Sequence, residues 1–323
     1  MKKLVKVILI ILLCVGCTPN KESVSTKEEI INNIISYDNN YDYDFLNYIY
    51  NNYGINTLEN INTSYKNNTY SYNVWHDLTG NSLKALKDLS NNNLDNTKII
   101  DKKGDITLSF VGDISLADNF DIMPYYDSRN EGVYGILSKE VVDIMTSSDI
   151  MVANNEFTIS TRGTPLNKTY TFRADPKRLN IYKEMGVNLV SLANNHIYDY
   201  GIEAFNDTLK YLKEYDIPFV GAGQNISEAK KSFSYIVGGY KISFISSTRA
   251  EKNIITPGAT ETTPGVFRCY DNTLLKETIK EEKEKSDYVV LLIHWGKEDS
   301  HELEEVIKVT GKEYIDEGAD LII

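Results

Sequence analysis

The sequence predicts an α/β fold, because short apolar runs typical of buried strands alternate with segments typical of amphipathic helices. Four of these runs are followed by a short polar cluster: Gly112-Asp113, Asn154-Asn155-Glu156, Asn194-Asn195-His196 and His294-Trp295-Gly296. In open α/β sheets, ligands bind outside the carboxyl ends of the strands. The clusters therefore indicate one site built by several strands together.

The expected elements begin near Asp105 and continue to the last residue. Asp199 is expected to cap a helix that places Ile202, Phe205, Leu209 and Leu212 on one face. The remaining expected helices cover residues 177–185, 274–285 and 303–317, and the expected strands cover residues 106–111, 149–153, 188–193, 217–220, 241–246, 288–293 and 319–323. A final apolar strand that stops at the last residue suggests that the sequence is C-terminally incomplete.

The composition limits the classes of partner. The chain has 323 residues, of which 41% are hydrophobic, enough for one large domain or two modest ones. Its formal charge of -12 argues against nucleic acid as a partner. An acidic polymer would also be repelled overall, so contact with one requires a local basic patch or a metal.

The N-terminus has the pattern of a signal peptide. Lys2, Lys3 and Lys6 precede an apolar run over residues 7–15, which is short for a membrane span. Residues 12–17 resemble a bacterial lipobox, with Cys14 where Leu is usual, and the resemblance implies lipidation of Cys17. Residues 1–17 are thus expected to be a lipoprotein signal peptide that leaves the mature protein anchored outside the cytoplasm. An ordinary secretory signal or an N-terminal anchor is the alternative.

Residues 18–104 are rich in Asn, Tyr, Asp and Ser. This composition predicts a low-complexity tether between the membrane and the main domain, with some local helix. The many tyrosines leave a small packed unit as an alternative. His76 lies here without a partner motif and is expected to be a surface residue. The mature chain would retain Cys17 and Cys269, so an internal disulfide is not expected.

From Asp105 to Ile323, the order of motifs resembles the capsule-synthesis family typified by CapA, which takes part in poly-γ-glutamate biosynthesis. The matching stretches are residues 110–113, 155–156, 172–174, 186–196, 199–201, 221–225, 228–229, 294–298 and 318–320. The resemblance implies a layered α/β/α sandwich similar to the calcineurin-like metallophosphoesterases. This chain departs from the family where Asn155 directly precedes Glu156 without an intervening Leu, and where it ends before a His-rich motif.

The residue types at the strand ends suit a divalent metal ion. Asp113, Glu156, Asn195 and His294 are the candidate ligands, since carboxylates, amide oxygens and neutral imidazole bind such ions. Each has a structural alternative: a turn-capping Asp, a surface salt bridge, an amide bonded to its own backbone, or a hydrogen-bonded core histidine.

The Asn195-His196 pair resembles that of the metallophosphoesterases, which implies that His196 stabilises a transferring phosphoryl group. Glu156 is also a candidate base, and Asp199 is a candidate to orient His196. Arg173 and Asn194 are the candidate substrate-binding residues, Arg173 because a guanidinium binds carboxylate or phosphate in a bidentate fashion. The other basic residues nearby, Arg162, Lys168, Lys177 and Arg178, are expected on a solvated face, and His301 at the surface.

Three functional hypotheses remain open. The first is a surface-anchored protein of capsule or poly-γ-glutamate biosynthesis with a metal-dependent hydrolase site. The second is a non-catalytic subunit that binds or assembles an anionic polymer. The third is a general extracytoplasmic metallophosphoesterase. The expected partners are an anionic polymer or phosphorylated substrate, the membrane through the lipid anchor, and capsule-synthesis membrane subunits.

Overall fold

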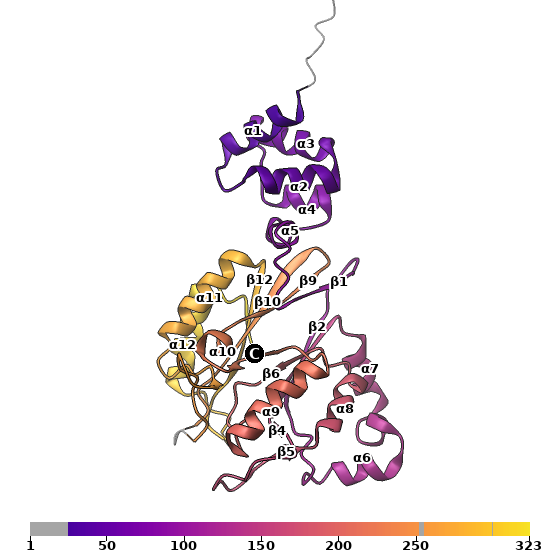
Figure 1. The fold of residues 1–323 in the computed structure, drawn as a ribbon, viewed down its shortest axis with the longest axis vertical. Helices are drawn as coiled ribbons and strands as arrows, with labels where there is room; N and C mark the ends of the chain where they lie inside the picture. Colours follow the sequence, from indigo (N-terminus) through magenta and orange to yellow (C-terminus); the bar gives the residue numbers. More distant parts are fainter. Residues whose placement is uncertain (1–24, 252–254, 299) are drawn as a thin grey trace, which may run out of the picture. The chain divides into compact units, whose positions relative to one another are not determined.

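The computed structural model describes residues 25–251, 255–298 and 300–323, which form two compact units, one ending at Thr69 and the other spanning Tyr70–Ile323 (Figure 1). The expected signal peptide and Cys17 lie outside the described residues. Across the described part of the chain, no helix combines the length and the apolar character needed to cross a bilayer.

The first unit consists of packed helices where the sequence predicted a tether. Its helices are α1 (Lys27–Tyr37), α2 (Tyr43–Tyr53) and α3 (Ile55–Lys66). A capping box between Thr26 and Glu29 begins α1. The core of the unit contains Ile30, Ile31, Ile34, Leu46, Ile49, Leu58 and Ile61, all at most 1% exposed. The alternative of a small packed unit therefore describes this segment better.

The second unit contains two sheets. One has the strand order β1-β9-β10-β12-β13 and the other β2-β3-β6-β7. The first sheet comprises β1 (Thr97–Ile100), β9 (Phe233–Val237), β10 (Tyr240–Thr248), β12 (Tyr288–His294) and β13 (Leu321–Ile322). The second comprises β2 (Leu108–Ile114), β3 (Ile150–Asn155), β6 (Leu189–Ser191) and β7 (Phe219–Val220). All neighbouring pairs in these sheets are parallel except β9 and β10.

The two sheets pack face to face across an apolar seam. The seam joins Val152 and Leu189 of one sheet to Phe244, Val290 and Leu292 of the other. Because both faces of β12 are buried, its sequence is a continuous apolar run rather than an alternating one. The α/β class predicted from the sequence is confirmed, while the layer order is α/β/β/α instead of α/β/α.

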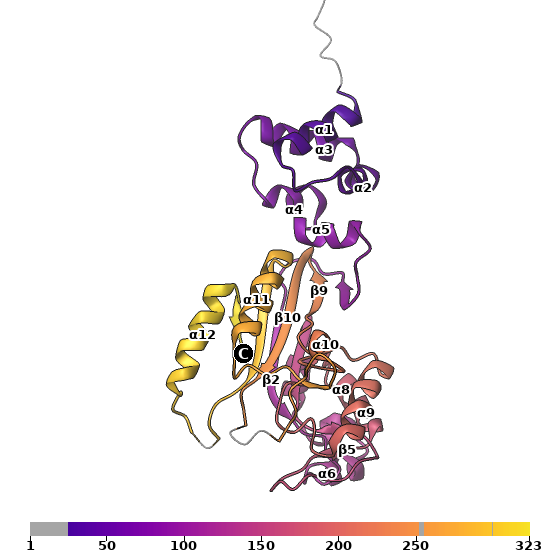
Figure 2. The same cartoon turned by 60° about the vertical axis from the view of Figure 1, so that its left-hand side comes forward.

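Helices cover the two outer faces (Figure 2). α11 (Thr273–Lys285) and α12 (Glu305–Glu317) cover the β12 sheet, and α8 (Leu179–Glu184) and α9 (Gly201–Glu214) cover the β3 sheet. The other helical elements of this unit are α4 (Asn73–Thr79), α5 (Leu83–Ser90), α6 (Met123–Arg129), η1 (Gly132–Gly135), α7 (Lys139–Ser147), η2 (Pro176–Arg178) and α10 (Ile226–Ala229). Short strand pairs join β4 (Thr158–Ile159) to β5 (Arg173–Ala174) and β8 (Ala222–Gly223) to β11 (Gly265–Val266).

Two details of α9 differ from expectation. Its N-cap is Tyr200, and the Asp199 carboxylate is bonded elsewhere. Ile202 is 41% exposed, whereas Phe205, Leu209 and Leu212 are buried as predicted. The helix therefore begins later than the sequence indicated, and Asp199 is free for another role.

The segment that contains α4 and α5 docks on the β10 and β12 end of the sandwich. The Lys84 ammonium donates to the carbonyls of Lys283 and Ser286 at 2.7 Å. His76, expected at the surface, is partly buried and stacks on Tyr240 at 4.4 Å between ring centroids. Residues 70–90 thus belong to the α/β unit rather than to a tether.

A Gly239→Ala substitution tests this docking. Gly239 has φ +80°, and a Cβ there would overlap the carbonyl oxygen of Gly80. We expect a loss of about 2 kcal/mol or more in unfolding free energy, because the left-handed backbone and the close approach both exclude a side chain. Urea unfolding measures it.

Gly311→Ala is the matched control. Gly311 lies inside α12, and its nearest neighbour would be an ordinary contact with Trp295 at 3.6 Å. Alanine there should stabilise by about 0.5–1 kcal/mol. Equal stability of the two variants would contradict the docking of the 70–90 segment.

Candidate metal centre

The candidate site lies where the carboxyl ends of strands from both sheets meet. Asp113 is paired in register with Asn154, and Glu156 follows directly after β3. His294 is the last residue of β12 in the other sheet. The site therefore draws its side chains across the seam between the sheets.

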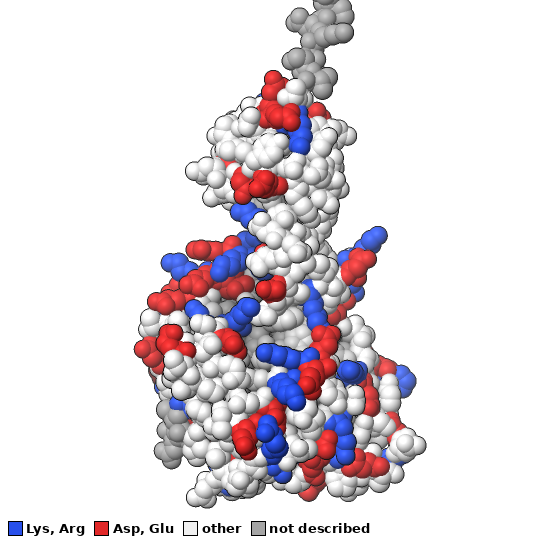
Figure 3. All heavy atoms as spheres, in the orientation of Figure 1, with Lys and Arg blue, Asp and Glu red and all other residues white. Residues whose placement is uncertain are grey.

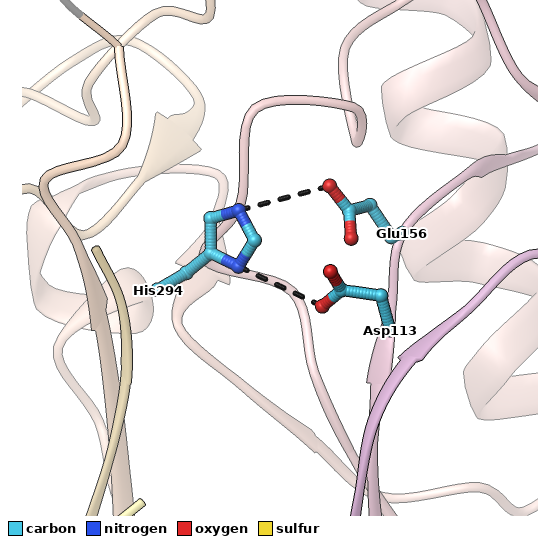
Figure 4. Close-up of side chains that lie close together, drawn as sticks. All are labelled: Asp113, Glu156 and His294. Carbon is cyan, nitrogen blue, oxygen red and sulfur yellow. Dashed lines mark ion pairs between the residues drawn. The ribbon is translucent and has the colours of Figure 1, made fainter. Parts of the chain in front are cut away.

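Asp113, Glu156 and His294 form the core of the site (Figure 4). His294 Nδ1 lies 3.8 Å from Asp113 Oδ1, and its Nε2 lies 3.7 Å from Glu156 Oε1. One potential ligand atom from each residue lies within 4.8 Å of the others. Asp113 is exposed, whereas Glu156 and His294 are partly buried, so the group opens to solvent on the Asp113 side.

Two asparagines complete the group. Asn195 Oδ1 lies 2.9 Å from His294 Nε2, so the structure brings this predicted ligand to the same place. Asn154 Nδ2 lies 2.7 Å from Asp113 Oδ1 and 3.4 Å from His294 Nδ1. Asn154 belongs to one of the predicted polar clusters but was assigned no role there, although its position at the end of β3 is the signal that could have given it one.

The two carboxylates strongly affect each other's protonation. Burial raises the pKa of Glu156 to about 9, with further contributions from a hydrogen bond to Asp113 and from the charge of Asp113. Burial also acts to raise the pKa of Asp113, but hydrogen bonds with Glu156 and Asn154 outweigh it and lower the pKa overall. In the absence of a cation, the pair therefore holds one proton between two acids.

The His294 imidazole is held in its neutral form. Its burial lowers its pKa, although the charge of Asp113 acts in the opposite direction. Neutral imidazole is the form that binds metal ions. The core of the site thus offers carboxylate oxygens, an imidazole nitrogen and an amide oxygen, a donor set that suits divalent ions.

His196 faces this group from a buried hydrogen-bond network. Its Nδ1 lies 2.7 Å from Asp199 Oδ2, and its Nε2 lies 4.0 Å from Glu156 Oε1. Asp199 is fully buried and also accepts from Lys168 Nζ at 2.7 Å and from the Phe172 amide at 2.8 Å. Asp199 is therefore placed to orient His196, and it does not cap α9.

Lys168 was expected on a solvated face, and the structure places it in this network. Its ammonium donates to the Asn195 carbonyl at 2.6 Å as well as to Asp199. The contact stabilises the buried Asp199 carboxylate and fixes the backbone that carries Asn195. Arg178 is likewise buried, with Asp127 and Asp118 as its partners.

A protein-family model covers the part of the chain that carries this site. The model of the bacterial capsule synthesis protein family, PGA_cap, matches residues 107–323. The chain belongs to this family. The match begins at β2 and covers the strands that supply Asp113, Glu156 and His294.

Individual proteins are also similar to part of this chain. The chain is 28% identical over 226 residues to the capsule biosynthesis protein CapA of Bacillus anthracis, covering 68% of this chain and 53% of that protein. It is 28% identical over 221 residues to the PGA biosynthesis protein CapA of Bacillus subtilis (strain 168), covering 68% and 56%. A probable polyglutamine synthesis accessory protein of Mycobacterium tuberculosis is 27% identical over 160 residues, covering 47% and 42%. The chain thus spans about half the length of these relatives.

In this member of the capsule synthesis family, the Asn194 side chain holds the backbone around the site and does not point into it. The residue is fully buried, and its Oδ1 accepts from the amides of His196 and Ile197 at 3.0 Å. Its Nδ2 donates to Asn154 Oδ1 at 3.0 Å and to the Asn155 carbonyl at 2.9 Å. All its hydrogen-bonding capacity is used, so the predicted contact with substrate is replaced by a positioning role.

Arg173 also differs from its predicted role. Its guanidinium lies 4.2 Å from the centre of the Tyr200 ring and donates to the carbonyls of Arg162 and Gly163 at 3.0 and 3.3 Å. These contacts hold the 162–163 loop and do not bring Arg173 to the group around Glu156. The contacts of Arg173 therefore do not support the predicted role in anion binding.

Asn194→Ala tests the positioning role. The substitution leaves the buried amides of His196 and Ile197 without an acceptor, so we expect a loss of about 2–4 kcal/mol in unfolding free energy by urea titration. Asn180→Ala is the control, because exposed Asn180 bonds only the Lys177 carbonyl, at 3.1 Å, among the described residues. Similar stability of both variants would contradict the proposed support by Asn194.

Proposed function

We propose that this protein is a metal-dependent hydrolase that acts on an anionic polymer or its precursor in capsule or poly-γ-glutamate biosynthesis. The observation that carries the proposal is the convergence of Asp113, Glu156 and His294 within 4.8 Å. Family membership and the names of the Bacillus relatives supply the biological setting. We further propose that the protein works outside the cytoplasm, held by a lipid on Cys17 and in contact with membrane subunits of capsule synthesis.

The residues present fit a divalent ion. Asp113 and Glu156 hold one proton between them, and a bound cation can take the place of that proton. Asp113, Glu156, Asn195 and His294 would hold the ion. When bound, such an ion supplies Lewis acidity to a substrate oxygen and an activated water.

The protein's own groups would orient the reaction. Asp199 fixes the ring of His196 through Nδ1, so that Nε2 points towards Glu156. From this position, Nε2 can donate a proton to a leaving group or stabilise negative charge on the group under attack. Lys168 and the Phe172 amide keep Asp199 in place.

The mixed surface charge indicates that polymer contact is local. On the face of the α/β unit in Figure 3, acidic and basic side chains intermingle without a broad basic area. A polyanion would therefore be held at a confined site rather than along this face.

Metal binding is tested with His294→Ala and Asp113→Asn. His294→Ala removes a donor nitrogen and Asp113→Asn removes the carboxylate charge, so we expect divalent-ion affinity to fall about tenfold or more, as measured by isothermal titration calorimetry after chelator treatment. His301→Ala is the control, because His301 is exposed and lies outside the group. Equal affinities of the His294 and His301 variants would refute the proposed centre.

Catalysis is tested separately with His196→Ala. Metal affinity should be kept, because Asp113, Glu156 and His294 remain, whereas turnover should fall by about 10²-fold or more with loss of proton transfer. Release of fragments from poly-γ-glutamate and hydrolysis of a simple phosphodiester are the two assays. Polymer binding without turnover in the metal-loaded protein would show a non-catalytic subunit, and turnover of the phosphodiester alone would indicate a general phosphoesterase.

A further inference from the structure

A hollow of about 550 Å³ adjoins the candidate metal centre. Asn195, which contacts His294, lies in its wall. The remaining lining residues are Lys168, Arg249, Ala250, Glu251, Tyr270, Gly296, Lys297, Glu298 and Glu304. Its volume lies within the range of sites that enclose a small ligand. A substrate that reaches the metal centre from this side would occupy the hollow.

Arg249 has a fixed position relative to His294. The last residue of β10, Thr248, is in register with His294 on β12. The Arg249 amide donates to the His294 carbonyl at 2.9 Å, and Thr248 Oγ1 donates to the same carbonyl at 3.0 Å. The Arg249 side chain therefore begins beside the strand end that carries the candidate metal ligand.

The Arg249 guanidinium is held in place by Tyr270. It lies 5.0 Å from the centre of the Tyr270 ring, and Nη1 donates to the Tyr270 carbonyl at 3.3 Å. The Tyr270 hydroxyl is itself bonded to the Glu251 carbonyl. Among the described residues, no carboxylate forms an ion pair with Arg249, so most of its donors remain open to a ligand.

Besides Arg249, Lys297 is the second basic residue in the wall whose charge is available to a ligand. Lys168 is bonded to Asp199, and Glu251 pairs with Arg268 at 3.6 Å. Lys297 is exposed and has no ion pair in the part of the chain that the structure describes. The exposed Glu298 and Glu304 also line the hollow and disfavour an anion next to them, so an anion is expected to lie nearest to the Arg249 guanidinium.

We propose that Arg249, assisted by Lys297, forms a subsite that binds a carboxylate of the polymer chain beside the metal centre. This inference rests on the proposed function, which supplies the polycarboxylate; a guanidinium itself binds either carboxylate or phosphate, and the binding assay distinguishes the two. Arg249 is the main binding residue, because a guanidinium held on an aromatic ring binds a carboxylate in a bidentate fashion. A polymer with its carboxylates amidated would lose this contact.

The test measures the binding of a short fluorescent oligo-γ-glutamate to the full chain by fluorescence anisotropy at low salt. Arg249→Gln should weaken binding about tenfold, and Lys297→Gln about threefold, because each removes a charge-assisted contact. Arg129→Gln is the matched control: Arg129 also lies over a tyrosine, Tyr125 at 5.3 Å, and donates to a carbonyl, that of Gly135 at 2.7 Å. It does not line the hollow and should bind as the wild type does.

Further experiments distinguish a failure of this subsite from a failure of the proposed metal centre. In chelator-treated protein, Arg249→Gln should still weaken oligomer binding relative to the wild type, so a failure of metal binding or turnover would leave the subsite testable. The thermal midpoint of each variant shows whether it is folded, and exposed Lys297 provides a second probe if Arg249→Gln unfolds. Wild-type affinity of folded Arg249→Gln would overturn the proposal. Equal binding of oligo-γ-glutamine, or full displacement of the oligomer by equimolar inorganic phosphate, would overturn it as well.

Discussion

The apolar seam between the two sheets determines where every candidate ligand lies. Asp113 and Glu156 belong to one sheet and His294 to the other, so their separations of 3.8 and 3.7 Å exist only while the sheets keep their present packing. Val152 and Leu292 pack across the seam, and a 2.7 Å hydrogen bond joins Ser191 to Ser246 within it. Because interiors are close-packed, a change of volume in this layer would displace one half of the site relative to the other.

The sequence predicts the local part of this arrangement well. Buried strands appear as apolar runs, and the residue that follows each run must lie at the carboxyl edge, so Asp113, Glu156, Asn195 and His294 could be identified as neighbours. The split into two sheets could not be predicted in this way, because an apolar run reports burial and not the identity of the partner. The same reason explains why Asn154 was assigned no role, since its contact with Asp113 depends on which strand pairs with β2.

The errors about polar residues have a common physical cause. Lys168 and Asn194 are polar residues near loops, which usually indicates solvent exposure. Both are buried here because the 194–199 turn needs hydrogen-bond partners that come from elsewhere in the chain. In the first unit, the Asn and Tyr content concealed the helical spacing of Ile30, Ile31 and Ile34, which is the signal for α1.

The net charge of -12 does not conflict with the binding of a polyanion at Arg249. Charges separated by more than a Debye length, about 8 Å at physiological salt, are largely screened, so most of the acidic surface has little effect on a carboxylate in the hollow. What acts there is the local set of charged groups in the wall, which includes Arg249, Lys297, Glu298 and Glu304. A bound divalent ion would offset the charges of Asp113 and Glu156, so metal loading and carboxylate binding should reinforce each other.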